Sequence, residues 1–153
     1  EHLPNIVKIY RPKVVVVDAM PETSKAREFQ ALYPRNMVWL SYYFNGPQGN
    51  KKEENAVWNP AEVTGLLDRT RILDETFAGF YGMTSTLPAY ARNIRDYYKH
   101  MMASIRTTTE DSSHQLVTKY IDVGADHYAH AEVYALVASK ARYGQGGVEG
   151  AGP

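Results

Sequence analysis

The pattern of apolar and polar positions predicts an α/β unit near the start of the chain. Residues 14–17 are four consecutive valines followed by Asp18, and such a β-branched run favours a strand that is covered on both faces. Residues 22–33 carry apolar side chains at helical steps, and residues 37–44 are again rich in aromatic and β-branched types. A strand, a helix and a strand in this order predict a right-handed crossover between parallel strands.

Four further helices are expected. Residues 4–10 fit the end of a first one. Asp68 is suited to cap a second, which ends at Gly82. The strongest helical period covers residues 90–105, and Asp126 opens a last helix that ends near Tyr143.

Polar segments separate these helices. Residues 45–55 have the composition of a solvated loop, and residues 107–114 are polar and turn-rich. Short extended pieces are expected at residues 63–67 and 115–121. The glycine-rich residues 144–153 are expected to form a disordered tail.

Composition narrows the class of protein. The 153 residues, 44% of them hydrophobic, suffice for one domain with a core, which we place at residues 1–143. Lys plus Arg and Asp plus Glu both total 17, so no overall basic charge attracts a polyanion. The absence of cysteine excludes disulfides, thiolate catalysis and zinc–cysteine sites. No apolar stretch approaches the ~18 residues of a spanning helix, and no membrane association is expected.

Two carboxylates stand out by their position. Asp18 ends a predicted buried strand, and ligands of open α/β sheets gather at the carboxyl ends of strands. Asp126 lies at the start of a predicted helix, where the helix dipole favours a negative charge. Each position also suits a plain turn or cap residue. Oxygen ligands without cysteine favour magnesium or manganese over zinc.

Several segments resemble the nuclease domain of tailed-phage terminase large subunits. They are Val-Val-Val-Val-Asp-Ala-Met-Pro-Glu at residues 14–22, residues 26–29 with 38–40, residues 68–74, and Asp-His-Tyr-Ala-His-Ala-Glu-Val-Tyr-Ala at residues 126–135. Their order is that of the family, and the resemblance covers about residues 4 to 140. It implies a ribonuclease-H-like α/β fold with parallel strands flanked by helices. It also implies hydrolysis of double-stranded DNA with two divalent ions, Mg²⁺ or Mn²⁺.

The resemblance assigns Asp18 as the metal ligand that ends the fourth strand of that fold, and Asp126 as the acidic residue of its final helix. The first catalytic aspartate of the family precedes an antiparallel hairpin, and no such hairpin precedes Asp18. The helix expected directly after Asp18 disfavours the alternative in which Asp18 is that first aspartate. We therefore expect residues 1–153 to be the C-terminal part of a nuclease domain, with three strands and the ATPase motor upstream.

This expectation has consequences for activity and partners. The fragment alone is expected to lack one catalytic carboxylate, and its valine strand would leave an open edge that favours a partner or dimer. The implied partners are double-stranded DNA, the upstream part of the protein and the portal of the procapsid. The implied location is the host-cell cytoplasm, transiently at the procapsid portal.

Other polar residues have weaker assignments. His127, His130 and Asp74 are candidate auxiliary groups, although histidines on an alanine-rich helix also serve as surface residues. Basic residues are candidates for phosphate contacts, although on a neutral chain they also simply face solvent. They are Lys13, Lys51, Lys52, Arg69 and Arg71.

Three classes of function stay open. A metal-dependent nuclease predicts that Asp18 and Asp126 lie within contact range of each other. An interaction or DNA-docking module of the packaging motor predicts separated carboxylates or no metal uptake. A generic nucleotide-binding α/β domain is the third class, but Ala19-Met20-Pro21 replaces a glycine-rich phosphate loop after the valine strand.

Overall fold

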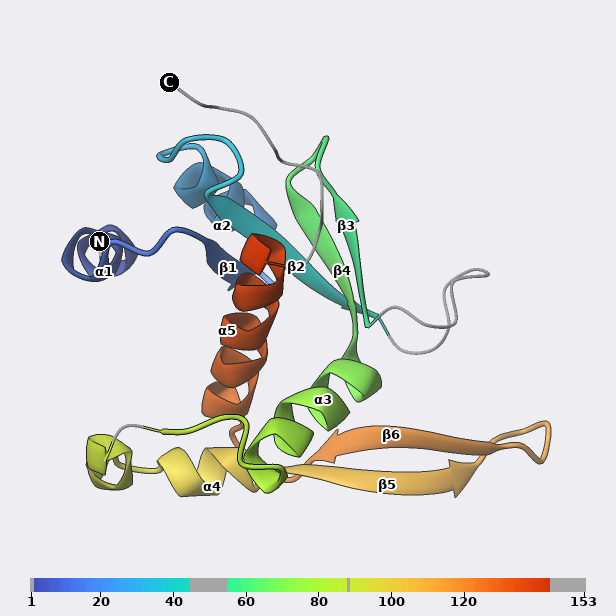
Figure 1. The fold of residues 1–153 in the computed structure, drawn as a ribbon. Helices are drawn as coiled ribbons and strands as arrows, with labels where there is room; N and C mark the ends of the chain where they lie inside the picture. Colours follow the sequence, from blue (N-terminus) through green and yellow to red (C-terminus); the bar gives the residue numbers. More distant parts are fainter. Residues whose placement is uncertain (1, 45–54, 88, 144–153) are drawn as a thin grey trace. The chain divides into compact units, whose positions relative to one another are not determined.

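The computed structural model describes residues 2–44, 55–87 and 89–143 (Figure 1). The predicted loop at residues 45–55 and the tail at residues 144–153 therefore lie almost wholly outside the described residues. The chain divides into two compact units. The first comprises the residues up to Tyr43, Ala56–Leu67 and the residues from Tyr134 on, and the second consists mainly of Asp68–Val133.

A mixed four-stranded sheet forms the centre of the first unit. Its strands have the order β1-β2-β4-β3. The first two pair in parallel and the last two pair antiparallel. Their bounds are β1 (Val15–Asp18), β2 (Val38–Phe44), β3 (Ala56–Asn59) and β4 (Thr64–Asp68). The parallel pairing of the valine strand with the aromatic strand confirms the predicted strand, helix and strand unit.

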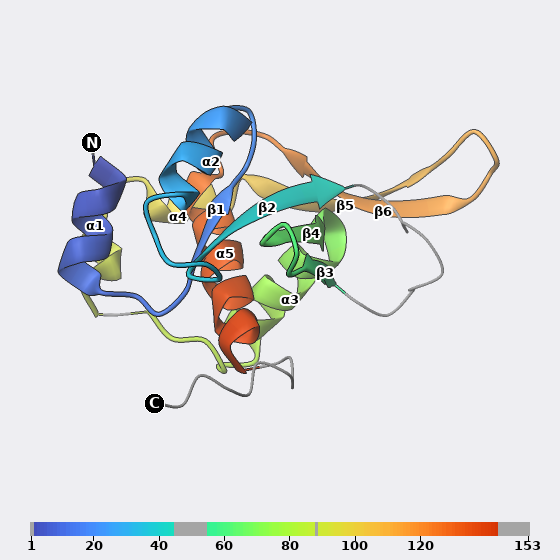
Figure 2. The same ribbon diagram turned by 90° about the horizontal axis from the view of Figure 1, so that it is seen from above.

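Two helices pack on this sheet. Helix α1 (His2–Tyr10) precedes β1, and α2 (Thr23–Gln30) joins β1 to β2, beside which it lies in Figure 2. Phe29 of α2 forms a buried cluster with Val7 of α1 and Val38 of β2. Burial of one such side chain stabilises a fold by about 1.5–3 kcal/mol. The β1–α2–β2 connection is therefore held by apolar packing, as the apolar residues of these segments predict.

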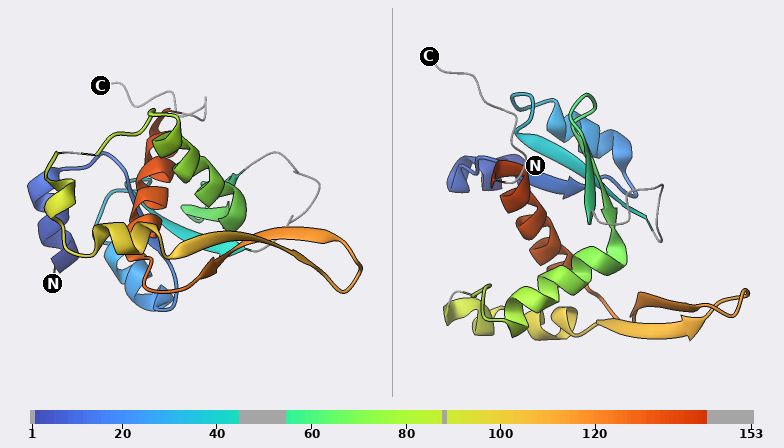
Figure 3. Two further views of the ribbon diagram at one scale, coloured as in Figure 1. Left: turned by 90° about the horizontal axis from the view of Figure 1, so that it is seen from below. Right: turned by 45° about the vertical axis from the view of Figure 1, so that its right-hand side comes forward.

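The second unit contains a long antiparallel hairpin, several helical segments and the first part of the last helix. Figure 3 shows the hairpin as a two-stranded ribbon made of β5 (Ser104–Glu110) and β6 (Leu116–Asp122). Ser104 pairs with Asp122 at its open end and Glu110 with Leu116 near its turn. The helical segments are α3 (Arg69–Tyr81), a 3₁₀ helix η1 (Ala89–Asn93) and α4 (Tyr97–Met101).

The helix predicted after Asp68 is confirmed. Asp68 is its N-cap, and the carboxylate accepts a hydrogen bond of 3.1 Å from the backbone N–H of Arg71. Gly82 follows the last turn, as predicted, and Ile72 on the inner face is fully buried. Local capping chemistry was sufficient to fix both ends of this helix.

The prediction of one helix over residues 90–105 is wrong. Only η1 and the five residues of α4 are helical there, and Asp96 between them has a left-handed φ of 63°. From Ser104 onward the chain joins a strand instead. Tyr97, Tyr98 and Met101 of that pattern lie on α4, whereas Ile105 belongs to β5, because strand pairing further along overrides the local helical pattern.

The prediction of a loop over residues 107–114 is also wrong for its first half. Thr107 to Glu110 pair with residues 116–119 of β6, and only the segment after them turns. Asp111 organises that turn, because its carboxylate accepts hydrogen bonds from the backbone N–H groups of Ser113 and Gln115. Threonine suits a paired strand, so the polar sequence belongs to a solvated ribbon.

Strand β3 was not predicted. It has four residues and occupies an edge of the sheet, opposite β4. Trp58 of β3 packs edge-on against Trp39 of β2 with ring centroids 4.9 Å apart. So short a strand has almost no periodic signal, and its antiparallel pairing with β4 is what makes it a strand.

Helix α5 (His127–Tyr143) matches the predicted last helix in both bounds. Ala129, Val133 and Val137 are fully buried, at spacings of four residues. These positions are those expected for the inner face of a helix. None of the described helices combines the length and the apolar character that a membrane crossing requires.

Candidate functional site

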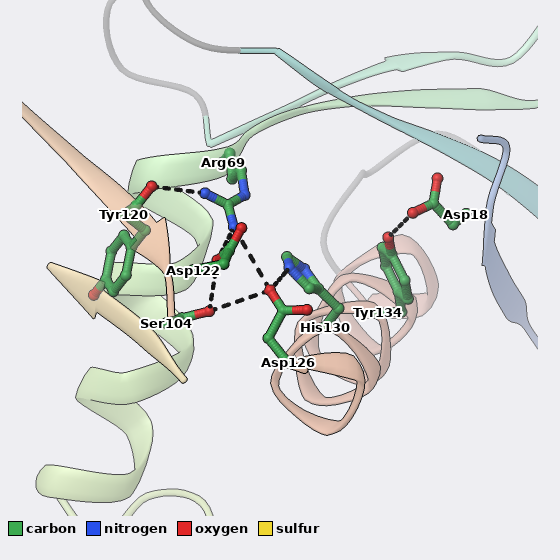
Figure 4. A network of polar contacts seen from close by, with 8 residues as sticks. All are labelled: Asp18, Arg69, Ser104, Tyr120, Asp122, Asp126, His130 and Tyr134. Atoms are coloured by element: carbon green, nitrogen blue, oxygen red, sulfur yellow. Dashed lines mark hydrogen bonds and ion pairs between the residues drawn. The ribbon is translucent and has the colours of Figure 1, made fainter. Parts of the chain in front are cut away.

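Asp18 ends β1 and exposes its carboxylate at the carboxyl end of a parallel strand. Oδ1 accepts a hydrogen bond of 2.9 Å from the backbone N–H of Met20, so the turn after the strand orients the group. Oδ2 accepts a hydrogen bond of 2.7 Å from the hydroxyl of Tyr134 on α5, drawn in Figure 4. Asp18 is therefore both a turn residue and a carboxylate oriented by a distant helix.

Tyr134, the hydrogen-bond donor to Asp18, was not among the candidate residues predicted from the sequence. Burial is the main cause that raises the pKa of its hydroxyl, and the neighbouring Tyr43 and Asp18 raise it further. The ring of Tyr43 lies 5.9 Å from that of Tyr134, centroid to centroid. The Tyr134 hydroxyl consequently stays protonated and acts as a donor to Asp18.

Asp126 directly precedes α5 and belongs to the second unit. Its Oδ2 lies 2.8 Å from Nε2 of His130, one helical turn on, and 3.4 Å from Oγ of Ser104 (Figure 4). Burial raises the pKa of Asp126, but the charge of His130 and hydrogen bonds outweigh burial, so this pKa lies below its usual value. Asp126 is therefore ionised at neutral pH.

Arg69 balances the negative charge next to Asp126. Its Nη2 lies 2.6 Å from Oδ1 of Asp122 and 3.7 Å from Oδ2 of Asp126, and its Nη1 donates to the carbonyl oxygen of Tyr120 at 2.9 Å. Ser104 Oγ lies 3.3 Å from Oδ1 of Asp122. The guanidinium thus lies between two carboxylates that would otherwise repel each other.

Asp122 is a member of this network that sequence reasoning missed. It ends β6 and lies four residues before Asp126. An acidic residue at a strand end so close to a second acid was a signal of the same kind as Asp18. The extended piece expected at residues 115–121 agrees with β6 to within one residue, but it stops one residue short of Asp122.

Asp18 and Asp126 belong to different units, so each carboxylate is described with its own neighbours. Within the described parts of the chain, no group of three or more His, Asp or Glu side chains is arranged to hold a metal ion. The surroundings of each carboxylate indicate how well it suits the expected Mg²⁺ or Mn²⁺. Asp18 fits such an ion, because a carboxylate offers about four lone-pair directions and two are used. Asp126 suits such an ion less well, because the positive charge of Arg69 lies 3.7 Å from its Oδ2.

The auxiliary candidates have structural partners. The ring of His127 packs edge-on against that of His100, with centroids 5.5 Å apart. Asp74 accepts hydrogen bonds from Nε of Arg106 at 2.8 Å and from the hydroxyl of Tyr120 at 2.9 Å. Asp74 therefore fastens α3 to the hairpin, and His130 is the one auxiliary candidate that contacts a candidate catalytic carboxylate.

The basic candidates are divided between the two units and the residues outside the described ranges. Lys13 is exposed in the first unit. Arg71 has its Nε 3.6 Å from Oδ2 of Asp68, while the side chain of Arg69 is only 16% exposed. Lys51 and Lys52 lie outside the described residues. Lys13 thus belongs to the first unit, and Arg69 and Arg71 belong to the second, where each has an acidic neighbour.

Comparisons with known proteins give no relative for this chain. No family model, no curated protein sequence and no solved structure matches it.

Proposed function

We propose that this chain is part of a divalent-metal-dependent DNA endonuclease of the phage-terminase type, with a ribonuclease-H-like fold. One observation carries the proposal: the exposed carboxylate of Asp18 lies at the carboxyl end of a parallel strand and is oriented by two hydrogen bonds. This is the position at which open α/β sheets bind ligands. The resemblance of residues 14–22 and 126–135 to the terminase nuclease supports the same assignment.

The fold is compatible with the proposal. The first unit has a mixed sheet with helices packed on it, and β1 and β2 form the parallel pair that the family requires. The valine strand occupies one edge of this sheet. In the proposed assignment that edge receives the strands expected upstream.

In this proposal Asp18 and Asp126 are the carboxylates that would hold Mg²⁺ or Mn²⁺. Such ions, when bound in a pair, activate water for attack on a phosphodiester and stabilise the leaving oxygen. The chain itself supplies carboxylate ligands: Tyr134 orients Asp18, and the charge of His130 together with hydrogen bonds holds the pKa of Asp126 below its usual value. The proposed substrate is double-stranded DNA, acted on with the ATPase motor at the procapsid portal in the host cytoplasm.

The decisive experiment measures metal binding and DNA cleavage together. Calorimetry with Mn²⁺ and a plasmid cleavage assay are run on the 153-residue chain and on Asp18→Asn. We expect the substitution to lower Mn²⁺ affinity about tenfold or more, which is a loss of about 1.4 kcal/mol, and to abolish any cleavage. Neutralising a ligand removes both charge and donor strength.

A matched control is available four residues away. Glu22 is an exposed acid before α2 whose side chain makes no cap hydrogen bond, so Glu22→Gln makes the same change in charge without touching Asp18. It should leave Mn²⁺ affinity unchanged. Wild-type protein that takes up no Mn²⁺, or equal affinities for Asp18→Asn and wild type, would overturn the proposal.

A second candidate function follows from the pairing of Arg69. A guanidinium 2.6 Å from Asp122 and 3.7 Å from Asp126 already compensates the charge of these acids. This favours an interaction or DNA-docking module of the packaging motor with incomplete chemistry. DNA binding without Mn²⁺ uptake would support this alternative over the nuclease.

A further inference from the structure

The second unit contains an apolar groove that none of the sites above uses. It has a volume of about 1120 Å³ and lies among α3, η1, α4 and β5. Its lining is mostly aromatic and aliphatic. The members used below are Phe77, Tyr81, Ile94, Tyr98, Met101 and Met102. We call this feature the α4 groove.

The apolar lining of the α4 groove is accessible to solvent. Tyr81 is 84% exposed, Tyr98 is 74% exposed and Met102 is 56% exposed. Contiguous exposed apolar side chains of this kind mark interaction sites on soluble domains. Paired methionines such as Met101 and Met102 are common at surfaces that receive apolar side chains, because their side chains adapt their shape.

Most of the charged side chains that line the α4 groove are cationic. Four cations line it, and Asp96 is its one acidic residue among those described. The cations are Arg92, Arg95, Lys99 and Arg106. Asp96 already accepts from Lys99 at 3.0 Å and lies 3.4 Å from Nε of Arg95. Carboxylates are therefore the groups that these cations bind.

These ion pairs leave Arg95 and Lys99 available, whereas Arg106 is held by Asp74 at 2.8 Å. The side chain of Arg95 is 95% exposed and that of Lys99 is 79% exposed, and surface pairs of this kind contribute only about 0–1 kcal/mol. The side chain of Arg92 has no hydrogen bond or ion pair with any described residue. An incoming acidic partner can thus pair with Arg92 and exchange with Asp96 at little cost.

We propose that the α4 groove binds an acidic amphipathic helix of a partner protein. The volume exceeds the roughly 300–1,000 Å³ of small-molecule sites, so a peptide segment fits it better than a cofactor. A helix that places apolar side chains every three or four residues matches an apolar floor, and flanking Asp or Glu match the cationic rim. Base stacking on the aromatic rings is the competing mode, and the aliphatic members Ile94, Met101 and Met102 favour apolar side chains over it.

The test uses three labelled probes and fluorescence anisotropy on the 153-residue chain. The first is a peptide of about 18 residues, five turns of helix, with Leu on one face and Glu on the other. The second replaces every Glu by Lys, and the third is a single-stranded oligothymidylate of similar length. We expect the acidic peptide to bind about tenfold more tightly than the basic one and to weaken as salt rises.

Two substitutions separate the apolar and the charged contributions. Met102→Gln leaves the charge of the groove unchanged and should weaken binding of the acidic peptide about tenfold, because it removes an apolar contact. Met102 is exposed, so the fold should tolerate the substitution. Arg92→Glu should weaken binding of the acidic peptide and strengthen binding of the basic one. Leu32→Glu is the control, because Leu32 is 65% exposed and belongs to the first unit.

The outcomes decide the matter in both directions. Selective binding of the acidic peptide that both groove variants reduce, with Leu32→Glu unchanged and all variants folded by circular dichroism, supports the proposal. Equal binding of the two peptides, no binding of the acidic one, insensitivity to Met102→Gln, or a preference for the oligothymidylate overturns it. None of these readouts depends on metal uptake, so the result is independent of the proposed nuclease.

Discussion

The hydroxyl of Tyr134 donates a hydrogen bond of 2.7 Å to Oδ2 of Asp18, although the two residues are 116 positions apart. One end of this contact is the carboxyl end of β1 and the other is the middle of α5. The contact turns a strand-end carboxylate into an oriented one. It also makes the ionisation of Tyr134 a sensitive probe of the first unit.

Tyr134→Phe should change the dependence of stability on alkaline pH. Burial, the largest cause, raises the pKa of Tyr134 above its unfolded value, so its contribution is complete below about pH 10 and is lost as pH rises further. The loss is at most about 1.36 kcal/mol per pH unit for one group. Urea unfolding at increasing pH should show a shallower decline for Tyr134→Phe than for wild type.

Tyr10→Phe is the control for that experiment, because Tyr10 is 77% exposed on α1 of the same unit. The control should follow the wild-type decline. Equal slopes for Tyr134→Phe and Tyr10→Phe would show that the Tyr134 hydroxyl is not enclosed.

His130→Gln should reduce the loss of folding stability that the wild-type protein shows as the pH becomes acidic. The pKa of Asp126 lies below its usual value because the charge of His130 and hydrogen bonds outweigh the effect of burial. A lowered pKa contributes stability above the unfolded value of about 3.9, and this stability is lost as pH falls through the folded pKa. Removing the imidazole raises the pKa of Asp126, which carbon-detected NMR of the carboxyl group measures directly. An unchanged value would exclude His130 as the cause.

Asp68→Ala should destabilise the protein by about 1 kcal/mol, because it removes the side-chain acceptor that caps α3. Asp68→Asn keeps an acceptor oxygen and should retain most of the stability, although it loses the charge that faces Arg71 at 3.6 Å. Chemical denaturation of both variants gives the comparison. If Asn is as harmful as Ala, charge rather than capping dominates at this position.

Gly65→Ala should destabilise the sheet by about 1–3 kcal/mol through overpacking. Gly65 pairs with Trp58 across β3 and β4, and a Cβ there would lie 3.1 Å from a Trp58 ring atom. The displaced ring should also change tryptophan fluorescence. Gly124→Ala is the matched control, since its nearest neighbour would be 3.8 Å away. A Gly65→Ala variant as stable as Gly124→Ala would contradict the close contact.

Local chemistry in the sequence determined much of the fold. The valine run, the residues before Pro34 and the aromatic run were sufficient for the β1–α2–β2 unit, because apolar periodicity directly reflects which side chains are buried. Asp68 and Gly82 fixed the ends of α3 for an equally local reason, as caps bond to their own helix. Asp126 directly precedes α5, as its position in the sequence predicts.

Tertiary structure decided the elements whose pairing is not local. The polar Thr107 to Thr109 are strand residues because β6 lies opposite them, and the four residues of β3 are a strand because β4 does. The helical period over residues 90–105 failed where Asp96 adopts a left-handed conformation. Propensity is a weak signal wherever hydrogen bonds come from residues far along the chain.

The candidate sites divide along the same line. The sequence alone identified Asp18 and Asp126, because the position of a carboxylate at a strand end or a helix start is a local property. It could not identify Tyr134 as the donor to Asp18, or Arg69 and Asp122 as neighbours of Asp126. These partners are brought together by packing of elements distant in sequence, and the charge and orientation of each carboxylate depend on them.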